Sequence, residues 1–276
     1  MTETKKNISS AAAFFRLFRF ERTLMAALIT GSAAFASGVG VVLSLWMALS
    51  GWCLAVAGFS LNSFLQEKTD EKNRASISPV IRIAFSLVFI IFSIAVAFYV
   101  NPLSLILLVT ILFLVILMGL PFFKKPLIYA STVGLLHALH LLMGAAAGVL
   151  SLPLILLAVV LFFAIVGSRG IIDIRNFPKD LMTRKQTLPK RFGLTGTVKI
   201  SILCFILTYG LAIGTYFKAA FSLLYLYPVI ILAISGIICI FLFVKKAGPE
   251  MARKLTPFFT LITVFLICLA LILGSL

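Results

Sequence analysis

Charged residues are scarce in this chain, and acidic residues are the scarcest of them. Only 12% of the 276 residues are charged, with eight Asp and Glu against 24 Lys and Arg, while 62% are hydrophobic. A typical soluble domain is about one-quarter charged and about half apolar. The core of a soluble domain of this length is too small to bury so much apolar surface. The composition therefore predicts a membrane protein, in which lipid is the solvent of most side chains.

Cysteine and histidine are also too few and too scattered to build a metal or disulfide framework. Each cysteine lies within an apolar run, and no two form a Cys-x-x-Cys pair: Cys53, Cys204, Cys239 and Cys268. We expect them to be small buried hydrophobic residues. The net charge of +16 would suggest a nucleic-acid partner in a soluble protein. Here the basic residues lie between apolar runs rather than on one face, so no nucleic-acid partner is predicted.

Long apolar runs make up most of the chain, and nine of them reach the length of about 20 residues that a membrane helix needs. They are Thr23–Leu43, Leu45–Leu65, Val80–Val100, Leu103–Phe123, Leu127–Leu150, Leu152–Gly170, Leu194–Tyr216, Phe221–Val244 and Pro257–Leu276. Helices are expected because lipid offers no hydrogen-bond partners to the backbone. We predict an all-α fold, with a nine-helix transmembrane domain over residues 23–276 and a cytoplasmic segment over 1–22. Within that segment, phenylalanine and arginine are interleaved over Ala11–Arg22, which favours a short helix on the membrane surface.

The charges are distributed unequally between the two sides of the predicted bundle. Of the 24 Lys and Arg residues, all but Lys218 fall on the side that carries the N-terminus, and all eight acidic residues fall there too. Basic loops stay in the cytoplasm. We therefore predict a multi-pass protein of the cell membrane with its N-terminus inside and its C-terminus outside. An active site would face the cytoplasm.

Five of the eight acidic residues crowd into two loops, which follow the second and the sixth predicted spans. In the first loop, Asn62, Gln66 and Asp70 recur at every fourth position, so a helix would stack them on one face. A charged loop between two spans is, taken alone, more often simply solvated. This row therefore gains weight only together with a second one.

The second loop holds a similar row. Asp173, Asn176 and Asp180 are spaced by three and four residues, again on one helical face. Mg²⁺ prefers oxygen ligands and is usually bound by one or two carboxylates plus phosphate oxygens of a substrate. Two such rows facing each other would suit a magnesium-bound lipid diphosphate, with Arg and Lys side chains holding the remaining phosphate oxygens.

The two rows resemble the motifs of the UbiA prenyltransferase superfamily, which read NDxxDxxxD after the second span and DxxDxxxD after the sixth, often followed by TLPxxxG. The corresponding segments here are Asn62-Ser63-x-x-Gln66-x-x-x-Asp70, Asp173-x-x-Asn176-x-x-x-Asp180 and Thr187-Leu188-Pro189 with Gly193. Residues Pro121–Lys125 resemble the family's aromatic-Pro-x-x-Lys-Arg element. Ser63, Gln66 and Asn176 stand where the family pattern has Asp.

The resemblance implies a Mg²⁺-dependent transfer of an isoprenyl group from an isoprenyl diphosphate to a lipophilic or aromatic acceptor. It implies metal ligands at Asn62, Gln66, Asp70, Asp173, Asn176 and Asp180, with the three aspartates as catalytic residues. Diphosphate contacts are expected at Arg22, Lys124, Arg169 and Arg175, for which topology-setting charge is an equal explanation. Two alternatives stay open, namely a terpene cyclase of the same family and a transporter or non-catalytic membrane protein.

Two histidines lie within the fifth predicted span. His137 and His140 are three residues apart and so share a helical face. Ionisable groups inside a membrane are candidates for a functional site, and we predict that both contact the substrate. Hydrogen bonding between helices is the competing interpretation.

Overall fold

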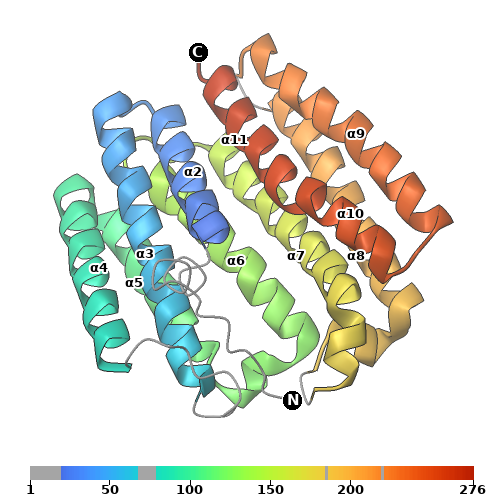
Figure 1. Cartoon of the computed structure of the whole chain (residues 1–276). Helices are drawn as coiled ribbons and strands as arrows, with labels where there is room; N and C mark the ends of the chain where they lie inside the picture. The colour runs from blue at the N-terminus through green and yellow to red at the C-terminus, as the bar shows by residue number, and fades with distance from the viewer. Residues whose placement is uncertain (1–19, 68–78, 184–185, 219–220) are drawn as a thin grey trace, which may run out of the picture.

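The computed structural model describes residues 20–67, 79–183, 186–218 and 221–276, and these residues form helices joined by turns, with no strand among them. The helices are α2 (Phe20–Ala36), α3 (Val41–Glu67), α4 (Pro79–Val100), α5 (Pro102–Leu117), α6 (Pro126–Ala145), α7 (Leu152–Leu181), α8 (Leu188–Lys218), α9 (Leu226–Lys245), α10 (Pro249–Pro257) and α11 (Thr263–Gly274). Shorter helical turns are η2 (Pro121–Lys124), η3 (Leu223–Tyr225) and the π-helical η4 (Phe258–Ile262). The predicted all-α fold is confirmed (Figure 1).

Seven segments of the described chain are long and apolar enough to cross a membrane. They are Val41–Leu61, Val80–Val100, Pro126–Ala145, Leu152–Leu181, Leu188–Phe217, Leu223–Lys245 and Pro249–Gly274. Two shorter apolar helices, Thr23–Ala36 and Pro102–Leu117, correspond to the remaining two predicted spans. The multi-pass architecture is therefore confirmed, while the count of nine crossings stays a prediction.

Glycine and proline set several helix boundaries that the apolar runs alone had misplaced. Helix α2 ends at Ala36, short of the predicted Leu43, because Gly38 and Gly40 adopt φ angles of 89° and 78°. Such left-handed conformations suit glycine and interrupt a helix. Helix α5 begins at Pro102, where Asn101 accepts a hydrogen bond from the backbone amide of Leu103 at 2.8 Å. An asparagine cap before a first-turn proline is a standard helix start.

Helix α7 is longer than the predicted sixth span and carries the second polar row inside it. It continues past Gly170 to Leu181, with Pro178 in its last turns. All three residues of the row, Asp173, Asn176 and Asp180, therefore lie on one continuous helix, as the spacing predicted. The last helical segment, made of α10, η4 and α11, also begins earlier than the predicted ninth span, at Pro249 rather than Pro257. It passes through the π-helical turn η4.

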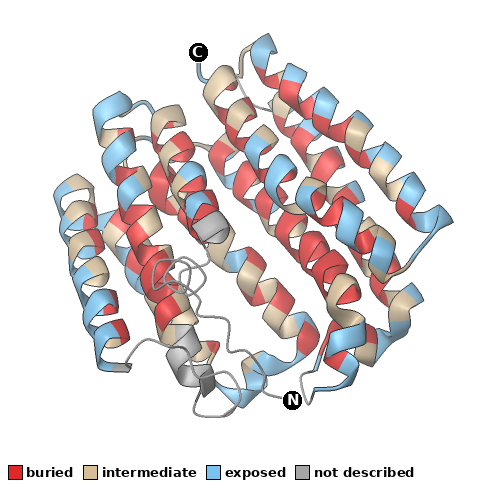
Figure 2. Ribbon diagram, in the orientation of Figure 1, coloured by how far each residue is buried: buried red, intermediate tan, exposed pale blue. Residues whose placement is uncertain are grey.

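The bundle has a buried centre and an apolar, exposed rim. The α7 span is 72% buried, whereas the α4 span is 17% buried, so α7 lies at the centre and α4 presents apolar side chains outward (Figure 2). Glycines allow α6 to approach α2 closely, because a Cβ on Gly144 would collide with the carbonyl group of Thr30. A Cβ on Gly148 would meet Ser37 in the same way. Small residues at such crossings are typical of helix packing in membranes.

Candidate active site

A cavity of about 240 Å³ lies inside the bundle, between α2, α3, α5, α6, α7 and the junction of α10 with η4. Most of its wall is apolar, with Met25, Leu54 and Ile111 among the lining residues. The polar lining residues are Tyr129, His137, His140, Ser168, Arg169, Arg175, Thr256 and Thr260. An apolar pocket with a few convergent polar groups is the usual form of a small-molecule site.

Arg169 is the most firmly held charge in the cavity wall. Its side chain is 9% exposed, and its Nη2 atom lies 3.2 Å from Oδ1 of Asp173, one turn further along α7. Its guanidinium group also lies 4.9 Å from the ring centre of Tyr129, on the facing helix α6. Stacking on an aromatic ring while paired with a carboxylate is a geometry that arginine makes and lysine does not.

Asp173 is buried and is engaged on both sides. Its Oδ1 faces Arg169 at ion-pair distance without the geometry of a hydrogen bond, and its Oδ2 accepts a hydrogen bond of 3.3 Å from the amide of Leu188. Leu188 belongs to the Thr-Leu-Pro segment that opens α8. This hydrogen bond joins the second polar row directly to the segment that follows it, so the Asp173 carboxylate holds the start of α8 close to α7.

The other two residues of the row differ from each other in their surroundings. Asn176 is partly exposed, and its Oδ1 accepts a hydrogen bond of 3.2 Å from Nε of Arg175. Asp180 is 8% exposed, and its Oδ2 has no hydrogen-bond partner among the described residues. A buried carboxylate oxygen without a partner is costly, and such groups commonly mark a place for a cation.

Two positions of the first polar row, 62 and 66, lie at the matching end of the bundle, although their side chains are outside the described part of the chain. Positions 62 and 66 belong to α3, which ends at Glu67, and Asp70 falls in the segment 68–78 that is not described. The carboxyl ends of α3 and α7 lie at the same end of the bundle (Figure 1). Leu54 and Gly58 line the cavity, and the same four-residue spacing continues along α3 to positions 62 and 66.

No group of three His, Cys, Asp or Glu side chains suited to a metal ion occurs among the residues that the structure describes. Of the six predicted metal ligands, only the three of the α7 row have side chains that the structure describes. Lys124, a predicted diphosphate contact, is exposed on η2 and is not part of the cavity lining. The side chain of Arg22, another predicted contact, lies outside the described part of the chain.

The two histidines of α6 both line the cavity, and both are oriented by their own helix. Nδ1 of His137 lies 2.8 Å from the carbonyl oxygen of Val133, and Nδ1 of His140 lies 2.7 Å from that of Leu136. Since a carbonyl oxygen can only accept, each Nδ1 is a donor and carries a proton. His140 is 6% exposed, and its Nε2 has no hydrogen-bond partner in the described structure.

Comparison with known proteins decides the family. Residues 23–273 match the model of the UbiA prenyltransferase family. The chain belongs to this family. The resemblance stated from the two polar rows is thereby confirmed, and no curated protein sequence matches the chain.

Solved structures of UbiA proteins share the fold. A digeranylgeranylglyceryl phosphate synthase is 21% identical with a TM-score of 0.78, over 96% of this chain and 98% of that one. A UbiA homologue from Aeropyrum pernix K1, in its apo form, is 17% identical with a TM-score of 0.76, over 94% and 99%. A UbiA homologue from Archaeoglobus fulgidus, bound to DMAPP and Mg²⁺, is 15% identical with a TM-score of 0.75, over 94% and 99%. At these identities the likeness establishes the fold.

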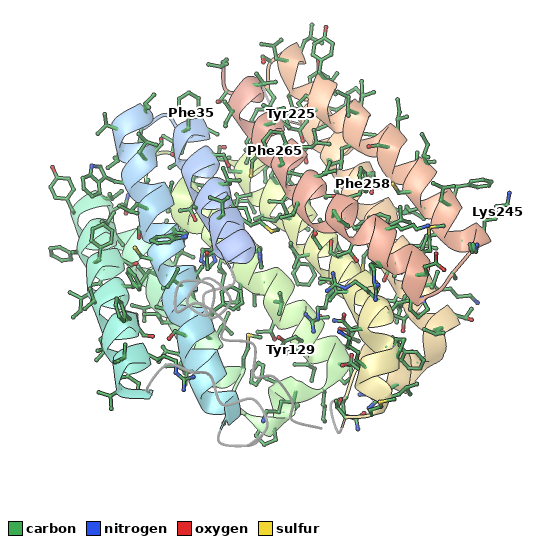
Figure 3. The ribbon with its side chains drawn as sticks, viewed as in Figure 1. Phe35, Tyr129, Tyr225, Lys245, Phe258 and Phe265 are labelled. Carbon is green, nitrogen blue, oxygen red and sulfur yellow. The ribbon has the colours of Figure 1, made fainter. Side chains whose placement is uncertain are left out.

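Sequence reasoning missed four polar residues of this UbiA cavity, namely Tyr129, Ser168, Thr256 and Thr260. Tyr129 lies near the start of α6, toward the lower end of the bundle in the view of Figure 3. It precedes His137 by eight residues, so helical spacing could have placed the two on one face. Ser168 offered no such signal in the sequence. Its hydroxyl donates to the carbonyl group of Phe259 in the π-helical turn η4, which is distant from Ser168 along the chain.

Proposed function

We propose that this UbiA family member is a membrane prenyltransferase, which moves an isoprenyl group from an isoprenyl diphosphate to a lipophilic acceptor. The observation that carries the proposal is the composition of the cavity. Arg169 and Arg175 supply two guanidinium groups, while residues such as Leu54 and Ile111 supply an apolar wall. One guanidinium group can bind two phosphate oxygens through two parallel hydrogen bonds, and an apolar wall suits an isoprenoid chain.

The residues present suit Mg²⁺ as the cofactor. The unpartnered Oδ2 of Asp180 would give Mg²⁺ a hard oxygen ligand, and Asn176 and Asp173 precede it by one and two turns on α7. The first row would complete the site with Asn62, Gln66 and Asp70. Magnesium bound there would neutralise the negative charge that develops on the leaving diphosphate. DMAPP and Mg²⁺ are the ligands named for the Archaeoglobus fulgidus homologue, and GPP and Mg²⁺ are named for a further structure of it.

The chain's own residues bind, orient and exclude water. Arg169 is held by Asp173 and Tyr129 before any substrate arrives, so a diphosphate meets a cation that is already positioned. In the transfer, the bond between C1 and the diphosphate oxygen breaks and its electron pair leaves with the diphosphate. The acceptor then forms a bond to C1 and loses a proton. The apolar wall keeps water from capturing the allylic cation first.

Purified full-length protein in lipid nanodiscs, incubated with geranylgeranyl diphosphate and Mg²⁺, tests the proposal. Release of diphosphate that depends on an added lipid extract, with a prenylated product in the mass spectrum, is the expected result. A cyclic hydrocarbon or alcohol formed without the extract would instead identify a terpene cyclase. Absence of diphosphate release with geranyl, farnesyl and geranylgeranyl donors would overturn both enzymatic readings and leave a non-catalytic membrane protein.

The acceptor can be sought in cells. Lipid extracts from cells with and without this protein are compared by mass spectrometry, and the proposal expects a prenylated lipid, quinone or tetrapyrrole to disappear with the protein. Unchanged isoprenoid lipids in the two extracts would count against a transferase.

A further inference from the structure

Four basic side chains lie close together at the connection between α9 and α10. Lys245 is the last residue of α9, and Lys246 begins the short connection that leads to Pro249 at the start of α10. Arg253 and Lys254 follow about 6 Å and 8 Å further along α10, at about 1.5 Å per residue. All four side chains are exposed, and Lys245 lies at the outer edge of the bundle (Figure 3). These four residues are called the basic corner below.

The basic corner has little counter-charge of its own. Glu250 is the one acidic residue between positions 245 and 254, so this stretch has a net charge of +3. Its Oε1 lies 3.5 Å from Nζ of Lys254, and the two side chains are 80% and 68% exposed. An ion pair so open to solvent is weak. The other three basic side chains have no acidic partner at ion-pair distance among the described residues.

Two general effects explain only part of this cluster. A lysine at the end of α9 complements the negative end of the helix dipole, which acts within the last turn. Arg253 and Lys254 gain nothing from a dipole, because they lie in the second turn after the positive end of the last helical segment. Basic residues beside a span also fix its orientation, but this effect depends on the side of the membrane and not on clustering at one corner.

The lengths of the two helices place the basic corner at the level of lipid head groups. The last apolar segment, Pro249–Gly274, has 26 residues and is about 39 Å long, whereas the hydrocarbon core is about 30 Å thick. With Gly274 at one edge of the core, Lys254 lies about 30 Å away, at the other edge. On α9, the exposed apolar residues Phe241 and Val244 come just before the corner. Positive charge at the membrane surface therefore adjoins an apolar surface below it.

We infer that the basic corner binds the phosphate head group of an anionic phospholipid in the adjoining leaflet. The Arg253 guanidinium group can bind two phosphate oxygens, the three ammonium groups add positive charge, and the acyl chains lie along the exposed apolar face of α9. A zwitterionic lipid carries its own cation, so its head group is bound less tightly. In the predicted orientation this leaflet faces the cytoplasm and carries the anionic lipids of the membrane.

A lipid bound at the basic corner would also stabilise one wall of the cavity. The inward face of α10 is formed by Ala252, Leu255 and Thr256, which are buried, and Thr256 lines the cavity. Helix α10 packs against α7, which carries Arg169. A head group that holds the outer face of α10 therefore favours the packed position of its inner face. The inference does not depend on the proposed transfer reaction, because it requires no isoprenyl substrate.

Native mass spectrometry of the full-length protein in detergent tests the inference by lipid binding alone. Dioleoylphosphatidylglycerol and dioleoylphosphatidylcholine, which share their acyl chains, are titrated separately, and the dissociation constant of the first bound lipid is measured. One basic residue near an anionic lipid surface contributes about fivefold to binding. We expect phosphatidylglycerol to bind about tenfold more tightly or better, with a preference that falls as ionic strength rises. Equal binding of the two lipids would overturn the inference.

Charge variants assign the preference to the basic corner. The double variant Arg253→Gln/Lys254→Gln should bind phosphatidylglycerol about tenfold more weakly than the wild type. The control Arg191→Gln/Lys199→Gln removes the same charge from exposed positions of α8 and should keep the wild-type affinity. Equal losses in the two double variants would show that total charge, and not this corner, attracts the lipid, and would overturn the inference.

Glu250→Gln tests the same site by a gain. It removes the acid that competes for Lys254, so phosphatidylglycerol should bind several-fold more tightly than to the wild type. Unchanged or weaker binding would count against the corner, and this variant decides the question if the double variant on α10 does not fold. As a second measurement, phosphatidylglycerol should raise the thermal unfolding midpoint of the wild type more than that of Arg253→Gln/Lys254→Gln. The same rise in both proteins would contradict the inference.

Discussion

Arg169 is the residue on which the geometry of the basic end depends. It is the only described partner of ion-pair type for the buried Asp173 carboxylate, at 3.2 Å, and it lies over Tyr129. Removing one partner of a buried pair leaves an uncompensated charge and typically costs about 3 kcal/mol or more. We expect Arg169→Ala to lower the unfolding free energy by about this amount and Asp173→Asn in the same chain to restore part of it.

Thermal unfolding followed with a thiol-reactive dye measures this loss. The four free cysteines include three that are buried, Cys53, Cys204 and Cys268, so the dye reports opening of the bundle. Arg175→Ala is the matched control, since Arg175 is only partly buried and donates one hydrogen bond to Asn176. It should cost about 1 kcal/mol. Equal losses in the two arginine variants would show that the Asp173 pair has no special weight.

Replacing Asp180 should affect stability in the opposite direction to replacing Arg169. Its Oδ2 is buried without a partner, so neutralising it removes an unfavourable charge rather than a favourable contact. We expect Asp180→Asn to leave the unfolding midpoint unchanged or higher without Mg²⁺. In the wild type, Mg²⁺ with a donor diphosphate should stabilise the fold by about 2.7 kcal/mol at a hundred times the dissociation constant. Asp180→Asn should lose this gain.

The same dye assay, with and without Mg²⁺ and geranylgeranyl diphosphate, gives the result. Asp173→Asn serves as the comparison, because its carboxylate is already bound by Arg169 and by the amide of Leu188. That variant should be destabilised even without Mg²⁺. A full Mg²⁺ response in Asp180→Asn would remove Asp180 from the metal site.

At the scale of single residues, spacing predicted the members of the α7 row but not their partners. The interval from Asp173 to Asp180 is a property of one helix, so it could be read from the sequence. The hydrogen bond from Leu188 to Asp173 depends on how the chain turns back between α7 and α8. The stacking of Arg169 on Tyr129 depends on the register between α6 and α7. Neither is encoded in local periodicity.

Helix packing depends on a few glycines whose hydrogen atom leaves room for a neighbouring backbone. A Cβ on Gly144 would meet the Thr30 carbonyl, whereas a Cβ on Gly210 of α8 meets nothing within 4 Å. We expect Gly144→Ala to cost about 1–3 kcal/mol through overpacking at the crossing of α6 and α2. Gly210→Ala should instead stabilise the helix by about 0.5–1 kcal/mol.

The pair separates packing from helix propensity, because the chemical change is the same and both sites lie within helices. The unfolding midpoints of the two variants are compared in one detergent. A stabilising Gly144→Ala would mean that α6 and α2 are further apart than the structure places them.

At the scale of the helix, the sequence predicted the existence of the apolar helices more reliably than their ends. The sixth span was placed too short because five of the eleven residues after Gly170 are charged or carry an amide, yet the chain remains helical as far as Leu181. The end of α2 was missed although Gly38 and Gly40 mark it. The π-helical turn at Phe258–Ile262 could not be predicted from local periodicity, and within it the carbonyl of Phe259 accepts a hydrogen bond from Ser168 of another helix.

For the whole molecule, composition alone predicted the class of protein, and the two polar rows predicted the family that residues 23–273 confirm. The number of crossings is the point at which sequence and structure leave a choice. Helices α2 and α5 have 17 and 16 residues. At 1.5 Å per residue they span about 26 Å and 24 Å, slightly less than a hydrocarbon core of about 30 Å. The distribution of basic residues must decide whether they cross.

Reporter fusions at two points distinguish nine crossings from seven. If α2 crosses, position 74 is cytoplasmic, and a green fluorescent protein fused there should fluoresce. If α2 and α5 do not cross, position 74 lies outside and the fusion should be dark, while alkaline phosphatase there becomes active. Lys68, Lys72 and Arg74 favour the first result, because basic residues beside a span resist export.

Both counts are odd, so phosphatase fused after Leu276 should be active in either case and controls for orientation. Inactive phosphatase at that end would contradict the predicted topology, since with nine crossings 23 of the 24 basic residues would then lie on the wrong side of the membrane.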